Sequence, residues 1–123
     1  MPDMTPGEEI GASRRARYDG PVSGKVIRLE EITGYITTGI SLGVGGGPLL
    51  CAPAALARQV IRSGVRDLRL IACSTGGYAL DLLIAAGCAT SVEFAQISLY
   101  EYGFAPAFRR AAESGRLRCL DHS

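Results

Sequence analysis

The sequence predicts an α/β fold: a parallel sheet of about four strands with helices on both faces, in an open, Rossmann-like βαβ arrangement. Three observations support this prediction. Apolar strand-like stretches alternate with helical stretches, the connections between them are short, and each helical stretch stops at a glycine. Hydrophobic residues make up 47% of the chain and charged residues 20%, an apolar excess typical of a buried parallel sheet.

The expected elements follow one another from residue 26 onward. A short helix is expected over residues 28–37, because Leu29, Ile32 and Ile36 fall on one helical face, although Gly34 weakens it. Strands are expected over residues 40–44, 65–73, 90–99 and 117–120. Helices are expected over residues 53–63, 78–86 and 105–114.

The length of 123 residues suits one domain. Residues 1–24 are rich in Gly, Pro, Ser and charge and contain Arg14, Arg15 and Arg17, so we expect a flexible extension there. Residues 25–123 are expected to form a single domain. Because a fourth strand at the end leaves a sheet edge and a helix-binding face uncovered, we expect this domain to be incomplete at its C-terminus.

The net charge and the length of the apolar runs argue against nucleic-acid and membrane partners. The formal net charge of +1 creates no field that would gather nucleic acid or an anionic membrane. No run reaches the roughly 18 apolar residues of a membrane span, and the acidic N-terminus is unlike a signal peptide, so a cytoplasmic protein is expected. The four cysteines, Cys51, Cys73, Cys88 and Cys119, form no CxxC pair. We therefore expect no metal site and mostly buried thiols.

Ligands of open parallel sheets bind beyond the carboxyl ends of the strands. This rule selects a rim built from residues 43–52, 73–77, 96–103 and 121–123. A glycine loop lies in the first of these segments, with Gly43, Gly45, Gly46 and Gly47 followed by Pro48. Glycines allow a positive φ and let a ligand approach bare backbone amides, which favours an anion or an oxyanion.

Two common readings of such a loop do not fit. Pro48 occupies the third glycine position of a dinucleotide-binding G-x-G-x-x-G, and the helix begins several residues too late. A P-loop is excluded because no Gly-Lys-Ser/Thr follows. A glycine turn that serves only tight strand-to-helix packing remains an alternative.

A second turn of small residues follows the second strand and leads into a helix. It consists of Ser74, Thr75, Gly76 and Gly77. Two neighbouring loops of free N–H groups, one at a helix N-terminus, suit a phosphate or a developing thioester oxyanion. We therefore expect both loops to face one ligand.

Several short segments occur in a characteristic order. They are LEEI (29–32), GISLGVGG (39–46), PAALARQV (53–60), GVRDL (64–68), GG (76–77), LDLLIAAG (80–87), YG (102–103), PAFRRA (106–111) and ESG (113–115). Their order and spacing resemble the N-terminal portion of family I CoA-transferase α subunits, nearest to the glutaconate type. The likeness covers about residues 28–121, and it implies a CoA-transferase-like α/β domain.

The resemblance implies an enzyme complex that moves CoA between an acyl-CoA and a carboxylic acid through acyl anhydride and glutamyl-CoA thioester intermediates. The catalytic glutamate would come from a β-type partner subunit, so no catalytic residue is expected in this chain and neither Glu93 nor Glu101 is assigned as nucleophile. Coenzyme A is then a substrate, no tightly bound cofactor is expected, and the protein forms a hetero- or homo-oligomer. The isolated chain should be inactive.

The resemblance also implies roles for the two loops. Gly45 and Gly46 are expected to support the oxyanion. The expected substrate- and CoA-binding positions are Gly43, Gly45, Gly46, Gly47, Ser74, Thr75, Gly76, Gly77 and Tyr102.

Two other functions stay open at this point. A small thioester hydrolase could use Cys73 or Ser74 with His122, the only histidine, because parallel strands carry them to one rim. A non-catalytic CoA- or anion-binding or assembly module could use the same loops without chemistry. The aromatic residues near the rim, Tyr78, Tyr100, Tyr102 and Phe104, could cover an acyl chain or pack at an interface.

Overall fold

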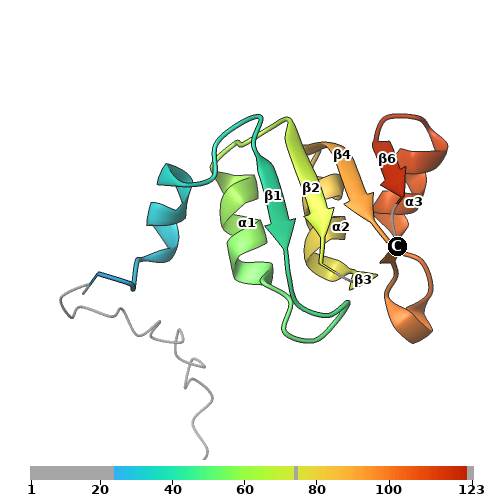
Figure 1. Cartoon of the computed structure of the whole chain (residues 1–123), viewed down its shortest axis with the longest axis horizontal. Coiled ribbons are helices and arrows are strands. Elements are labelled where there is room, and N and C mark those ends of the chain that lie inside the picture. Colours follow the sequence, from blue (N-terminus) through green and yellow to red (C-terminus); the bar gives the residue numbers. More distant parts are fainter. Residues whose placement is uncertain (1–23, 74, 122–123) are drawn as a thin grey trace, which may run out of the picture.

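A four-stranded parallel sheet forms the centre of the computed structural model, which describes residues 24–73 and 75–121 (Figure 1). The strands are β1 (Ser41–Val44), β2 (Leu68–Ala72), β4 (Ala89–Phe94) and β6 (Arg118–Asp121), in the order β1-β2-β4-β6. All neighbouring pairs are parallel. The predicted α/β class and the four parallel strands are therefore confirmed. Apart from Gly24, the expected N-terminal extension lies outside the described residues.

The helices lie where the sequence places them. They are α1 (Ala54–Arg62), α2 (Tyr78–Ala85) and α3 (Pro106–Glu113). Each ends just before a glycine with positive φ: +75° at Gly64 and +70° at Gly87 and Gly115. Glycine adopts this left-handed conformation without the steric cost that a Cβ would add, so it stops each helix. The helix expected over residues 28–37 is a short 3-10 helix, η1 (Leu29–Gly34), which packs beside α1.

The three α-helices share one face of the sheet. Helix α1 packs against α2, and α2 packs against α3. Each crossover moves one strand further in the same direction, so the right-handed crossover rule puts every helix on the same side. The expectation of helices on both faces is therefore wrong for the described residues, because that arrangement needs a strand order that reverses.

The core lies between this sheet face and the helices. The largest side chains buried there are Val60, Leu68, Leu70, Leu80, Leu83 and Val92. Phe94 of β4 packs edge-on against Phe108 of α3, with ring centroids 5.1 Å apart. The opposite face is more polar: Arg69 and Arg118 are exposed, and Arg69 Nε donates to Ser41 Oγ at 3.0 Å.

Two short strands form a second sheet at the carboxyl edge of the first. They are β3 (Thr75–Gly76) and β5 (Gln96–Ile97), which pair in parallel. The strand expected over residues 90–99 is therefore split into β4 and β5. The strand expected over residues 65–73 begins only at Leu68, after Asp67 with φ +57°. A short 3-10 helix, η2 (Tyr100–Tyr102), follows β5.

A buried carboxylate joins α2 to α3. Asp81 in α2 is 8% exposed, and its Oδ1 accepts from the Phe108 amide at 2.7 Å while Oδ2 accepts from the Ala107 amide at 3.3 Å. These amides belong to the first turn of α3, which no residue of its own caps. A negative charge at a helix N-terminus is favourable, so Asp81 serves as the cap that α3 lacks locally.

Replacing Asp81 with Ala should lower the free energy of unfolding by about 2 kcal/mol, because two amides lose their acceptor and α3 loses its cap. Urea unfolding followed by circular dichroism measures this. The matched control is Glu113→Ala, which removes an exposed ion pair with Arg109 (2.8 Å) and should change stability little. Equal losses in the two variants would contradict the capping role.

Candidate oxyanion and acyl site

The two glycine loops touch at the carboxyl edge of the sheet. The loop after β1 reaches across toward β3 (Figure 1). There the Pro48 carbonyl accepts from the Tyr78 amide at 2.8 Å. A Cβ on Gly77 would overlap the Pro48 backbone, with the Pro48 carbonyl carbon only 2.6 Å away. The predicted proximity of the two loops is confirmed.

The second loop is packed rather than open. Gly76 and Gly77 are buried, and a Cβ on Gly76 would meet Leu80 and lie 3.2 Å from Ala72 Cβ. The Gly76 carbonyl accepts from the Ser98 amide at 3.0 Å. Gly76 thus permits close packing of side chains and Gly77 close packing of backbone, a use that the sequence suggested only for the first loop. Thr75 is half-buried in β3, and Ser74 lies outside the described residues.

The first loop keeps open backbone. Gly43, Gly45 and Gly46 are exposed, and a Cβ on Gly43 or Gly45 would meet nothing within 4 Å. Gly46 is constrained differently: its φ is +90°, and a Cβ would lie 2.9 Å from the Cys51 carbonyl carbon. Gly47 donates its amide to the Leu50 carbonyl at 2.9 Å, which closes the turn.

The amides of Gly45 and Gly46 are the candidate donors. Among the described residues, no backbone or side-chain oxygen accepts from either amide. Exposed donors of this kind can serve a carbonyl oxygen that gains negative charge during a reaction.

An apolar cavity of about 330 Å³ opens beside this loop. It lies between β1, α1 and the segment that follows η1, and its lining consists of Ile36, Leu42, Gly43, Val44, Gly45, Cys51, Pro53, Leu56, Ala57, Val60 and Leu83. The structure therefore brings Gly43 and Gly45 to one hollow. The lining does not include Gly46, Gly47, Thr75, Gly76, Gly77 or Tyr102, so this cavity does not meet the expectation that both loops face one ligand. Sequence reasoning missed the cavity, because helix and strand periodicity identify apolar residues without showing where two apolar faces fail to meet.

Tyr102 stands on the rim instead. It lies in η2 and is 73% exposed, and Phe104 just after it is 70% exposed. The loop that carries them is closed by the Leu99 amide, which donates to the Gly103 carbonyl at 2.7 Å. Glu101 in the same loop is exposed, and Glu93 is half-buried in β4. Neither carboxylate lines the cavity.

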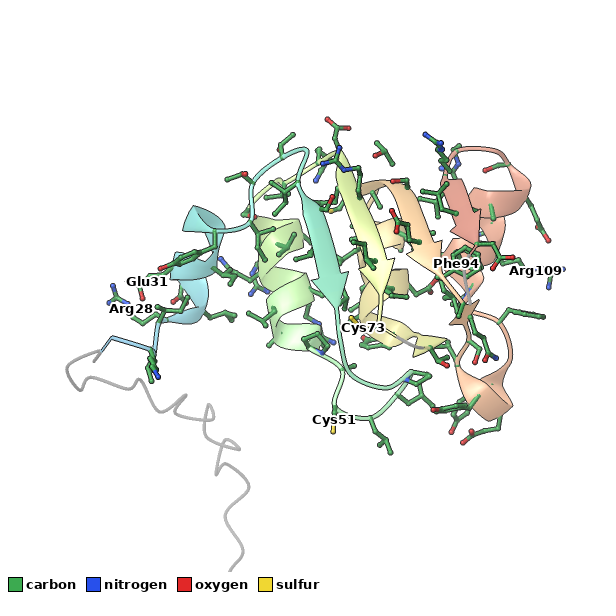
Figure 2. All side chains as sticks on the ribbon, viewed as in Figure 1. Arg28, Glu31, Cys51, Cys73, Phe94 and Arg109 are labelled. Carbon is green, nitrogen blue, oxygen red and sulfur yellow. The ribbon has the colours of Figure 1, made fainter. Side chains whose placement is uncertain are left out.

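Three thiols are exposed, so the expectation of mostly buried cysteines is wrong. Cys51, Cys73 and Cys119 are exposed, and only Cys88 is buried among the four. Figure 2 shows Cys51 on the loop after β1 and Cys73 at the end of β2. Burial raises the pKa of the Cys88 thiol, against the opposing effect of the Arg66 guanidinium, and also raises the pKa of Cys119. His122, the proposed partner of Cys73, lies outside the described residues.

No three His, Cys, Asp or Glu side chains in residues 24–73 and 75–121 gather in a way that could hold a metal ion. None of the helices over the same residues has the length and apolar character needed to cross a bilayer.

Comparison with known proteins relates the chain to subunits of several enzymes, although no family model matches it. Over 94 residues, 76% of this chain, it is 34% identical to the cholesterol ring-cleaving hydrolase IpdA subunit of Rhodococcus jostii. Over 51 residues, 42% of this chain, it is 39% identical to the acetate CoA-transferase subunit alpha of Escherichia coli. These matches span 31% and 23% of the two relatives, so the chain corresponds to about a third of their length or less.

Solved structures agree with these matches. A variant of the decarboxylase AibA/AibB superposes with a TM-score of 0.72 and 35% identity, covering 79% of this chain and 38% of that one. Glutaconate CoA-transferase from Acidaminococcus fermentans superposes with a TM-score of 0.73 and 25% identity, covering 81% and 32%.

The fold is that of a CoA-transferase-like α/β domain, with a glycine loop at the carboxyl edge of a parallel sheet. Part of the chain is similar in sequence to the α subunit of a CoA-transferase, and its fold is similar to that of glutaconate CoA-transferase. The resemblance seen in the sequence is confirmed.

Gly77→Ala and Gly45→Ala should differ sharply in stability. The Gly77 variant forces a Cβ into the Pro48 backbone, which cannot move aside as a flexible side chain would, so its free energy of unfolding should fall by about 3 kcal/mol. The Gly45 variant adds a methyl group in open space and should stay within about 0.5 kcal/mol of the parent. Thermal and urea unfolding measure both, and similar stabilities would show that the two loops do not pack as described.

Proposed function

We propose that this chain is the α-type part of a CoA-transferase that moves CoA between an acyl-CoA and a carboxylic acid. The observation that carries the proposal is a pair of exposed glycines, Gly45 and Gly46, beside an apolar cavity, with no acceptor for either amide among residues 24–73 and 75–121. Homology to an acetate CoA-transferase subunit supports it. Coenzyme A is a substrate in this proposal, and the reaction belongs to the cytoplasm.

The loop after β1 would stabilise the thioester carbonyl oxygen that becomes negative during the reaction. When a nucleophile adds to the thioester carbonyl, the electron pair of the C=O bond moves to oxygen, and donors already in place stabilise that charge. Such a donor typically raises the rate about 10²- to 10³-fold. Because Gly45 and Gly46 carry no side chain, the carbonyl can approach both amides closely.

The nucleophile is assigned to a β-type partner subunit. Glu101 is exposed on a rim loop and Glu93 lies in the sheet, and neither reaches the cavity lining. A partner glutamate would attack the thioester carbonyl and expel the CoA thiolate, which leaves an acyl-glutamyl anhydride. The thiolate would then attack the glutamyl carbonyl, which releases the first carboxylate and forms a glutamyl-CoA thioester. The second carboxylate would reverse these two steps, which yields the new acyl-CoA and regenerates the glutamate. Two relatives are themselves subunits, an IpdA subunit and a subunit alpha, which supports assembly with a second chain.

Exposed apolar side chains at the rim support this assembly. Leu50 is 76% exposed, Tyr102 73% and Phe104 70%, in loops on either side of the contact between Pro48 and Gly77. Aromatic residues are enriched at protein interfaces because they bury a large area with few rotatable bonds. We place the partner over these loops.

Hydrolysis is the second candidate, because a relative 34% identical to this chain is named a hydrolase subunit. The same amides would stabilise the same oxyanion, with water in place of the acceptor carboxylate. Product analysis separates the two: transfer yields a new acyl-CoA that depends on the added carboxylate, whereas hydrolysis yields free CoA without it.

Gly45→Val tests the role of the loop in the complex formed with the β-type subunit. With butyryl-CoA and acetate, the rate of acetyl-CoA formation should fall at least about 100-fold, because the added side chain keeps the carbonyl from the amides. The matched control is Gly34→Val, at a glycine of η1 that also has open space and no positive φ. Unchanged transfer by the Gly45 variant, or no transfer by the parent complex, would overturn the proposal.

Tyr102→Ser tests the proposed interface. The dissociation constant of the complex should rise about tenfold or more, since truncating a buried interface aromatic commonly costs more than 1 kcal/mol. Tyr35→Ser is the matched control, because Tyr35 is similarly exposed, at 69%, but lies just after η1 and not in the rim loops. Titration calorimetry measures both, and equal affinities would place the partner elsewhere.

A further inference from the structure

We infer that the cavity beside β1 binds the acyl group of the substrate, and that this acyl group is apolar throughout, with no charge at its far end. The inference rests on the proposed function for its placement of the thioester and goes beyond it by naming the substrate class. A cavity of about 330 Å³ is at the small end of the range for ligand pockets, which suits a short or medium acyl chain.

The side chains that line the cavity indicate the polarity of the ligand that it can bind. Its inner part is formed by Leu42 and Val44 of β1, Val60 of α1 and Leu83 of α2. Neither these side chains nor any other in the lining carries a charge or a hydroxyl or amide group. A second carboxylate of a dicarboxylic acyl group would lose its hydration there without finding a partner, and such burial is strongly unfavourable.

An alkyl chain, unlike a carboxylate, gains binding free energy when it enters this cavity. Each methylene group removed from water tightens binding about fourfold. The cavity thus selects apolar acyl groups over dicarboxylic ones.

The mouth of the cavity sets the orientation. Gly43 of β1 and Gly45 of the loop after it both line the cavity, and no described residue accepts a hydrogen bond from the Gly45 or Gly46 amide. A thioester carbonyl placed on the amides of Gly45 and Gly46 therefore leaves its alkyl chain to enter the cavity. The CoA part remains outside, toward the rim.

Cys51 supplies a reporter that does not depend on enzyme activity. Its thiol is exposed and the residue is part of the lining, so an occupied cavity should shield it from an alkylating reagent. Cys119 provides a control within the same molecule, because it is also exposed but lies on β6, at the opposite edge of the sheet.

The experiment measures alkylation of the full chain by iodoacetamide, with peptide mass spectrometry to separate the cysteines. Saturating hexanoyl-CoA should slow alkylation of Cys51 at least fivefold and leave Cys119 unchanged. Glutaryl-CoA and free CoA should need at least tenfold higher concentration for the same protection. Equal protection by glutaryl-CoA, no protection by hexanoyl-CoA, or equal slowing of Cys119 would overturn the inference.

A matched pair of variants keeps the test specific. Leu56 lines the cavity but is half-exposed, so Leu56→Glu puts a carboxylate at the wall without forcing it into the core. Ala55→Glu makes the same addition at the neighbouring exposed position of α1, outside the lining. With folding checked by thermal melts, the Leu56 variant should need about tenfold more hexanoyl-CoA and the Ala55 variant no more than the parent. Equal behaviour of the two variants contradicts an acyl site.

Hexanoate without CoA separates this inference from the proposed function. Protection of Cys51 by millimolar hexanoate, and not by glutarate, supports an apolar acyl cavity even if the assembled complex transfers no CoA. Equal protection by both acids, or by neither, counts against the cavity whether or not the complex is an active transferase.

Discussion

The backbone contact between Pro48 and Gly77 holds the candidate site together. It exists because Gly77 has no side chain, which lets the Pro48 carbonyl reach the first amide of α2. This hydrogen bond fixes the far end of the loop after β1, and the turn at Gly46, closed over the Cys51 carbonyl, fixes its middle. With both points held, Gly45 and Gly46 present their amides at the sheet edge instead of folding back onto it, and the mouth of the cavity stays open beside them.

The fold does not by itself choose the reaction. Proteins of similar sequence or structure are named as a hydrolase, a decarboxylase and CoA-transferases. One scaffold can carry several chemistries when the reacting groups come from loops and partner chains. In the proposed function, this chain would contribute donors for a negative oxygen and an apolar wall, both of which favour a thioester ligand. The groups that decide between transfer and hydrolysis would come from a second subunit.

The described sheet is covered on one side only. Its helix-facing side buries Leu68, Leu70 and Val92, whereas the other side exposes Arg69 and Arg118 and leaves Ile71 half-buried. Sequence patterns identified the strands but not this asymmetry. Apolar content suggested two buried faces, yet the side of the sheet that a helix covers depends on the order of the strands. That order follows from which strands pair, and local periodicity contains no such information.

The sequence alone determined the helices and strands, because glycines with positive φ stop the helices and apolar spacing marks their buried faces. It also indicated that the two glycine loops meet, since parallel strands carry their following loops to one edge. Only the tertiary structure decided which glycines are open. The space that a Cβ would take is free at Gly45, whereas Leu80 occupies it at Gly76 and the Pro48 backbone occupies it at Gly77. It also paired Asp81 with α3 and left the cavity beside β1. Each of these features depends on contacts between residues that are distant in the sequence. Glycines therefore differ in accessibility because tertiary packing gives each of them different neighbours.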